Sequence, residues 1–260
     1  MLKLPFFKKR PKPVVGFLVA GTQKGGTTAL HMWLKKHRQV MMAKRKEVHF
    51  FDNEKHDWKS RNYDPYHAYF KPNPRGKLVG EATPIYMYWN GAVRRIFEYN
   101  PEMKFVISLR DPVARAYSHW NMERDRARDS LSFWEAIQRE RDRCREALPG
   151  QHRVYSYVDR GFYTEQLRRL WCYFPSEQTL ILRHEALRET PQLVLDQICD
   201  FLGVACLSVA TTINAHSRPY VTTMAEREMA YLRWIFEYDI RALERMLGWD
   251  CSAWLADHWV

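Results

Sequence analysis

A glycine-rich segment near the start of the chain, GTQKGGTTAL at residues 21–30, contains residue types that can hold an anion. It follows an apolar run, VVGFLVA, and precedes a stretch with helical character. Backbone N–H groups in such a loop, and the positive end of the helix after it, attract phosphate. Gly25 and Gly26 let the main chain approach the ligand closely, and Thr27 and Thr28 add hydroxyl donors. The segment therefore predicts a phosphate-cradling loop.

The lysine of this loop precedes the glycines, whereas it follows them in the common phosphate-binding loop. In the Walker pattern GxxxxGK[ST] the lysine follows the glycines, and the next hydroxyl binds magnesium. Here Lys24 comes first, in the order Lys-Gly-Gly-Thr-Thr. This order disfavours an ordinary kinase or ATPase loop. A glycine-rich turn without a ligand is the alternative.

A second anion-binding signal lies in ISLRDPVARAYSHW, residues 107–120. Arg110 ends a predicted strand and offers a fork of donors that suits a phosphate. Ser118 lies about two helical turns farther along the predicted helix, so both side chains can converge on one phosphate. Ligands of open α/β sheets bind at the carboxyl ends of the strands. A salt bridge between Arg110 and Asp111 is the alternative.

The two segments together resemble the sulfotransferases that use PAPS, 3′-phosphoadenosine 5′-phosphosulfate. A third segment, RKEVHFFD at residues 45–52, resembles the KExHFF segment of the heparan-sulfate type, the Golgi enzymes that sulfate glucosamine units. A fourth, RGFYTEQLRRLWCYFP, is similar to the helix that precedes the last strand in that group. The C-terminal part, ending in LGWDCSAWL, resembles the last helix of bacterial sulfotransferases. The resemblance covers most of residues 14–205.

This resemblance implies an in-line transfer of a sulfuryl group, with PAP (adenosine 3′,5′-bisphosphate) as the product. Lys24 would donate to the bridging oxygen of the leaving group, and Glu47 would remove the proton of the acceptor hydroxyl. A salt bridge of Glu47 with Lys44 or Lys46 is the alternative. Arg110 and Ser118 would bind the 3′-phosphate. The residues expected to hold the 5′-phosphosulfate are Lys24, Gly25, Gly26, Thr27 and Thr28.

The same resemblance suggests further roles around the reacting group. His49 would orient Glu47 or contact the sulfonate, and a structural histidine is the alternative. Lys46 would help to neutralise the sulfonate. Tyr163 would contact the nucleotide or the acceptor, or belong to the core.

A basic loop, NAHSRPY at residues 214–220, corresponds to the loop that closes over the nucleotide in this family. Ser217 and Arg218 are therefore expected to contact phosphate. The resemblance implies no metal, since lysines and arginines supply the positive charge that magnesium supplies in kinases.

These residues need a scaffold, and the alternation of strand and helix patterns predicts one: an α/β fold. We expect a P-loop-like single domain over residues 14–260, with a basic tail at 1–13. A central, mostly parallel sheet should carry helices on both faces. Strands are expected at 14–20, after 38, near 77–81, at 104–110 and from 179. Helices are expected at 27–36, 92–99, 112–126, 131–143, 161–175, 191–202 and 224–247.

Composition limits the classes of function. The 260 residues carry a formal charge of +11, which attracts polyanions such as nucleic acid, acidic lipid or a multiply phosphorylated cofactor. No segment approaches the roughly 20 apolar residues that span a bilayer, and no cleavable leader is evident, so we expect a cytoplasmic protein. The five cysteines form no CxxC pair, which favours free thiols.

The prediction is thus a PAPS-dependent sulfotransferase acting on a hydroxyl, or an amine, of a small cytoplasmic molecule such as a secondary metabolite. The aromatic-rich stretch 52–70 and the residues near 86–89 could line the acceptor pocket. The partner is a small acceptor alcohol, with no nucleic acid and no stable membrane insertion. The alternatives are a Mg-ATP-dependent small-molecule kinase and a non-enzymatic basic protein that binds nucleic acid or membrane.

Overall fold

The computed structural model describes residues 14–73, 75–208 and 223–256. Within these ranges a single five-stranded sheet has the order β2-β3-β1-β4-β5. Every neighbouring pair of strands is parallel. The strands are β1 (Phe17–Gly21), β2 (Val40–Met42), β3 (Leu78–Ala82), β4 (Lys104–Leu109) and β5 (Thr179–Arg183). The predicted basic tail at 1–13 lies outside the described residues.

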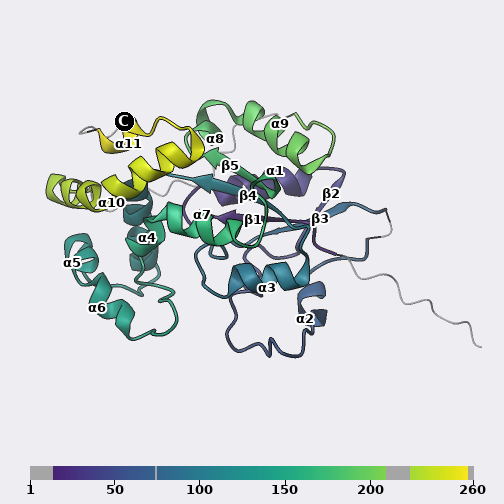
Figure 1. Cartoon of the computed structure of the whole chain (residues 1–260), viewed down its shortest axis with the longest axis horizontal. Coiled ribbons are helices and arrows are strands. Elements are labelled where there is room, and N and C mark those ends of the chain that lie inside the picture. Colours follow the sequence, from purple (N-terminus) through teal and green to yellow (C-terminus); the bar gives the residue numbers. More distant parts are fainter. Residues whose placement is uncertain (1–13, 74, 209–222, 257–260) are drawn as a thin grey trace, which may run out of the picture.

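The helices surround this sheet on both faces (Figure 1). They are α1 (Thr27–Lys36), α2 (Asp64–His67), α3 (Ala92–Tyr99), α4 (Pro112–Asp125), α5 (Phe133–Gln138), α6 (Glu140–Arg145), α7 (Tyr163–Trp171), α8 (Ala186–Glu189), α9 (Pro191–Leu202), α10 (Glu226–Leu247) and α11 (Ser252–Leu255), with short 3₁₀ turns η1 (Asp159–Gly161) and η2 (Ser176–Gln178).

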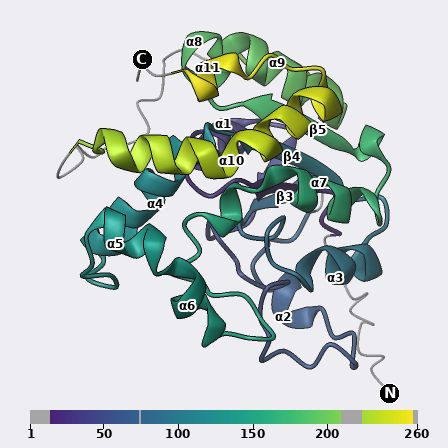
Figure 2. The same cartoon turned by 60° about the vertical axis from the view of Figure 1, so that its left-hand side comes forward.

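One predicted helix is wrong in its extent. The stretch expected as a single helix at 131–143 is divided into α5 and α6, which extend from α4 away from the sheet (Figure 2). Arg139, at φ −94° and ψ 1°, leaves the helical conformation between them. The break turns Glu140 inward, where its carboxylate accepts hydrogen bonds from the backbone N–H groups of Val158 and Asp159.

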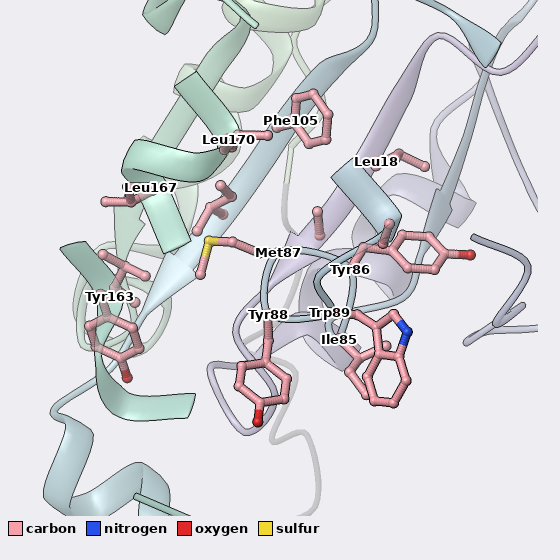
Figure 3. Packing of buried hydrophobic residues seen from close by; sticks show 14 of the residues in the cluster. Leu18, Ile85, Tyr86, Met87, Tyr88, Trp89, Phe105, Tyr163, Leu167 and Leu170 are labelled. Atoms are coloured by element: carbon pink, nitrogen blue, oxygen red, sulfur yellow. The ribbon is translucent and has the colours of Figure 1, made fainter. Parts of the chain in front are cut away.

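Alternating side chains of β1 build two cores. Phe17 and Val19 pack with residues of α1 and α9 on one face. Leu18 and Ala20 belong to the larger cluster on the other face, which includes residues of α3, α4, α7 and α10. Figure 3 shows part of this larger cluster, with Phe105 beside Leu170 of α7. A strand buried on both faces reads as a continuous apolar run, which is why β1 was recognisable in the sequence.

The strand order places a crevice beside β1. The chain runs from β1 to β2 and β3 on one side, and then crosses to β4 and β5 on the other. Such a switch point is where ligands of parallel α/β sheets bind, at the carboxyl ends of the strands. The connections that leave β1, β2 and β4 at this edge carry Lys24, Glu47 and Arg110.

The loop after β1 is fixed to the end of β4. The backbone N–H and the hydroxyl of Thr22 both donate to the carbonyl of Ser108, at 2.8 and 2.9 Å. Gly25 folds back to donate to the carbonyl of Thr22 at 2.9 Å. A Cβ atom at Gly25 would lie 2.5 Å from the Ser108 carbonyl oxygen. Only glycine therefore fits at this position.

Gly25→Ala tests this constraint. We expect a loss of roughly 1–3 kcal/mol in the free energy of unfolding, because the clash involves backbone rather than a side chain that can move. Urea unfolding measures the loss. Gly150→Ala is the control, since the exposed Gly150 has a single neighbour, at 3.1 Å. Equal stability of the two variants would contradict the assigned loop geometry.

Candidate active site

The two predicted anion-binding segments lie side by side. Arg110 follows β4 and donates from Nη1 to the carbonyl of Lys24 at 3.2 Å. The hydroxyl of Tyr163, at the start of α7, donates to the carbonyl of Arg110 at 2.7 Å. Tyr163 is fully buried, so it supports Arg110 from within the core, the structural alternative that the sequence had left open.

The helices after these loops carry the remaining predicted phosphate ligands. Thr27 and Thr28 form the first turn of α1, where Thr27 is buried and Thr28 is exposed. Ser118 lies buried on the second turn of α4. The carboxylate of Asp111 accepts from the N–H of Val113 at 2.9 Å and so caps α4. Ser217 and Arg218 fall outside the described residues.

The other wall of the crevice carries a line of charged side chains from the loop after β2. Glu47 Oε1 lies 2.6 Å from Lys46 Nζ, so the pairing that the sequence offered as an alternative role is present. Glu47 Oε2 lies 3.7 Å from His49 Nε2, which makes an ion pair rather than a hydrogen bond. His49 Nδ1 lies 2.8 Å from Oδ2 of the buried Asp52. Arg153 Nη1 donates to the same Asp52 oxygen at 2.5 Å.

These contacts determine the protonation states of Glu47 and His49. The two carboxylates beside His49, Asp52 first, raise the pKa of its imidazole to about 9. The imidazolium in turn, together with Lys46, lowers the pKa of Glu47 to about 2. At neutral pH the carboxylate is therefore ionised and able to accept a proton, while His49 is charged.

A buried carboxyl group behind this loop holds its backbone in place. Glu81, at the end of β3, accepts hydrogen bonds from the hydroxyls of Thr83, Tyr66 and Tyr86 at 2.7–3.0 Å. The Thr83 hydroxyl accepts from the N–H of Val48, and the Tyr86 hydroxyl accepts from the N–H of Phe50. The residues flanking His49 are thus connected to one carboxyl group through two hydroxyls. In Figure 3, Tyr86 and Met87 extend in opposite directions from the same turn.

Several of the predicted site residues also have unusual backbone conformations. Among the described residues, five non-glycine positions have positive φ, and three of them are Lys24 (71°), Glu47 (60°) and His49 (56°). Such conformations are costly for residues with a Cβ atom, and they collect at functional sites. These backbone conformations were not predicted from the sequence.

The crevice between the two walls forms a pocket of about 260 Å³. Glu47 and His49 line it on one side and Gln23 on another. The rest of its lining consists of Pro84, Ile85, Glu123, Arg126, Arg128, Arg153 and Arg160. Sequence reasoning missed the four arginines, Asp52 and Gln23. Arg126, Arg128 and Arg153 stand in none of the quoted segments, whereas Gln23, Asp52 and Arg160 stand inside quoted segments but were assigned no role. The aromatic stretch 52–70 that was expected to line an acceptor pocket contributes no residue to this lining.

Two features of the described ranges bear on the other predictions. None of the helices in the described part is long and apolar enough to cross a bilayer. Across the same residues, no group of three or more His, Cys, Asp or Glu side chains is arranged to hold a metal ion.

Comparisons with known proteins agree with the sequence motifs. The model of the sulfotransferase domain family matches residues 16–229. Bifunctional heparan sulfate N-deacetylase/N-sulfotransferase 3 of Mus musculus is 32% identical over 213 residues, which cover 77% of this chain and 24% of that protein. Heparan sulfate glucosamine 3-O-sulfotransferase 3B1 of Homo sapiens is 30% identical over 198 residues, covering 72% and 45%. The chain thus spans about a quarter to a half of the length of these curated relatives.

Solved structures show the same fold. A sulfotransferase from Alicyclobacillus acidocaldarius superposes with a TM-score of 0.80 at 28% identity, over 93% of this chain and 99% of that one. Mouse sulfotransferase SULT7A1 complexed with PAP superposes with a TM-score of 0.56 at 13% identity, over 88% and 86%. The second likeness concerns the fold alone. The predicted α/β class, with its central parallel sheet, is confirmed.

The Glu81 network predicts a pH dependence of stability. Burial raises the pKa of Glu81 from 4.5 to about 7. Between these values the unfolded chain releases a proton that the folded chain keeps, so stability falls as pH rises from 4.5 to 7, by roughly 3 kcal/mol. Glu81→Gln should remove this slope.

Urea unfolding at several pH values between 4.5 and 7.5 measures the effect as the difference between variant and parent. Glu102→Gln, a surface change, should leave the profile as it is. Parallel pH profiles for Glu81→Gln and the parent would show that Glu81 does not keep its proton in the folded state.

Proposed function

The chain belongs to the sulfotransferase family, and we propose that it moves the sulfuryl group of PAPS to a hydroxyl, or an amine, of a small acceptor and releases PAP. One observation carries the proposal. Gln23, the residue before Lys24 in the glycine loop, and the ionised Glu47 line one pocket at the carboxyl edge of the sheet. A phosphosulfate held by the loop would present its sulfur to an acceptor that Glu47 can reach.

The donor would be held by the segments fixed at the ends of β1 and β4. The N–H groups of Gly25, Gly26 and the α1 turn would bind the 5′-phosphate, which suits the positive end of a helix. Arg110 and Ser118 would bind the 3′-phosphate, and Ser217 and Arg218 are proposed to add contacts. The chain's own cations would take the place of a metal ion, so we propose that binding needs none.

The reaction would proceed by in-line displacement at sulfur. The acceptor oxygen forms the new S–O bond as the bond to the 5′-phosphate of PAP breaks, and the electron pair leaves with that phosphate. Lys24 would stabilise the charge on the leaving oxygen, and Glu47 would take the acceptor proton. The strong ion pairs of Glu47 make it a weak base in the free protein. The negative charge of a bound donor would draw Lys46 and His49 toward itself and so raise the basicity of Glu47.

The acceptor would be small at its reacting end and negatively charged nearby. A pocket of about 260 Å³ suits one ring or a short chain. Its four arginines outnumber Glu47 and Glu123, which favours an acceptor with a carboxylate, sulfate or phosphate beside its hydroxyl. We propose a cytoplasmic metabolite of this kind, such as a secondary metabolite.

Calorimetric titration with PAP tests the cofactor. We expect PAP to bind without any metal, and ATP with magnesium to bind at least about tenfold more weakly, which corresponds to 1.4 kcal/mol. The 3′-phosphate, which ATP lacks, is the physical reason. Tight binding of Mg-ATP with no preference for PAP would favour a kinase instead.

Glu47→Gln tests the base. The amide keeps the shape of the side chain but cannot accept the acceptor's proton, so kcat should fall about 10²–10⁴-fold while the affinity for PAP stays within about threefold. Glu98→Gln, which removes a surface carboxylate paired with Arg94 on α3, should keep full turnover. Sulfation measured with labelled PAPS distinguishes the two. Near-normal turnover of Glu47→Gln would remove this residue from the proposed role.

A further inference from the structure

A buried cation lies at the floor of the crevice. Arg160, in the η1 turn before α7, is only 3% exposed. Its guanidinium donates to the Ser156 hydroxyl at 2.9 Å, to the Arg153 carbonyl at 2.8 Å and to the side-chain oxygen of Gln23. All three acceptors are neutral. Among the described residues no carboxylate lies within 4 Å of this guanidinium.

The acids near Arg160 are engaged elsewhere. Asp159 accepts the hydroxyl of Tyr88 at 2.5 Å. Burial raises the pKa of Glu140, and its carboxyl group accepts from the backbone N–H groups of Val158 and Asp159 at 2.7 and 2.8 Å rather than from Arg160. Glu123 pairs with Arg126 and Arg128 at 3.0 and 3.5 Å. Glu123 and Glu140 stabilise the charge of Arg160 only through space, without a direct ion pair among the described residues.

A second buried cation adds to the excess of positive charge. Arg115 on α4 is fully buried, and its Nε and Nη1 atoms have no hydrogen-bond partner. Its charge contributes to a lowering of the pKa of Arg160, to about 10, which is due mainly to burial. Arg160 thus remains charged at neutral pH, and a buried charge without a counterion is costly. The site is built to receive an anion.

The position of Arg160 indicates which anion would bind there. It lines the same pocket as Glu47 and His49, and its bond to Gln23 connects it to the residue before Lys24. Because the oxygen of the Gln23 amide accepts from Arg160, the amide N–H groups remain available as donors. Arg160 and Gln23 therefore bring donors to the pocket that Glu47 also lines.

We propose that Arg160 and the Gln23 amide form a binding site for the sulfonate oxygens of the transferred sulfuryl group. This inference rests on the proposed function. No bond to Arg160 forms or breaks: the sulfur passes from the phosphate oxygen to the acceptor oxygen, the proton goes to Glu47, and the three sulfonate oxygens keep their contacts throughout. The guanidinium fork suits two of these oxygens at once.

The affinities for PAPS and PAP isolate this contact, since the two ligands differ only by the sulfuryl group. Arg160→Met removes the charge and keeps an apolar stem against the Tyr88 ring, which the guanidinium now covers at 4.9 Å. In calorimetry without acceptor, we expect PAPS to lose about 10–100-fold in affinity, the value of a hydrogen bond to a charged group, and PAP to change less than about threefold. The affinity of Arg160→Lys for PAPS should lie between that of Arg160→Met and that of the parent.

Arg94→Met is the control, because it removes a half-exposed arginine of α3 that lies outside the pocket. Its ratio of PAPS to PAP affinity should equal that of the parent. Equal losses for both ligands in Arg160→Met, or no loss for either, would overturn the proposal. If Arg160→Met does not fold, Gln23→Ala gives the same readout and should lower the ratio by about tenfold. Failure of the parent chain to bind PAP would instead refute the proposed function itself.

Discussion

The site depends on one contact, the double hydrogen bond from Thr22 to the Ser108 carbonyl. It joins the end of β1 to the end of β4, which are adjacent in the sheet although 86 residues separate the two partners. Gly25 has to pass over the same carbonyl, so no side chain is tolerated there. The loop is thereby shaped before any ligand arrives, and the cost of ordering it is met in folding rather than in binding.

The opposite wall is held by a different device. Glu81 is fully buried. The hydroxyls of Thr83 and Tyr86 connect its carboxyl group to the backbone on both sides of His49. The positive φ angles of Glu47 and His49 require such support, because an isolated loop would relax to ordinary conformations. One fixed wall carries Lys24 and the other carries Glu47, so the sheet sets the separation between the proposed leaving-group cation and the proposed base. Rigid placement of this kind is what an in-line displacement without a covalent intermediate needs.

Local signals were enough to predict the fold and the donor loops. The apolar run before the glycines, the strand-ending Arg110 and the helices α1, α3 and α9 all follow from neighbouring residues, and the bounds of these helices agree closely with the structure. The acceptor side could not be predicted in this way. Asp52 meets Arg153 across 101 residues, and Gln23 meets Arg160 across 137. No single motif contains both members of either pair, and only the folding of distant segments onto one sheet brings them together.

Charge connects the two halves of the site. The net charge of +11 alone would have fitted nucleic acid or membrane as well. Burial gives part of this charge a specific role, because a surface arginine is solvated and screened, whereas Arg115 and Arg160 are enclosed and form no direct ion pair within the described part of the chain. An enclosed cation discriminates between anions by shape and position, since only a group that reaches it recovers the lost solvation. The excess charge of this chain is therefore most specific at the floor of the crevice, where the smallest part of the donor would lie.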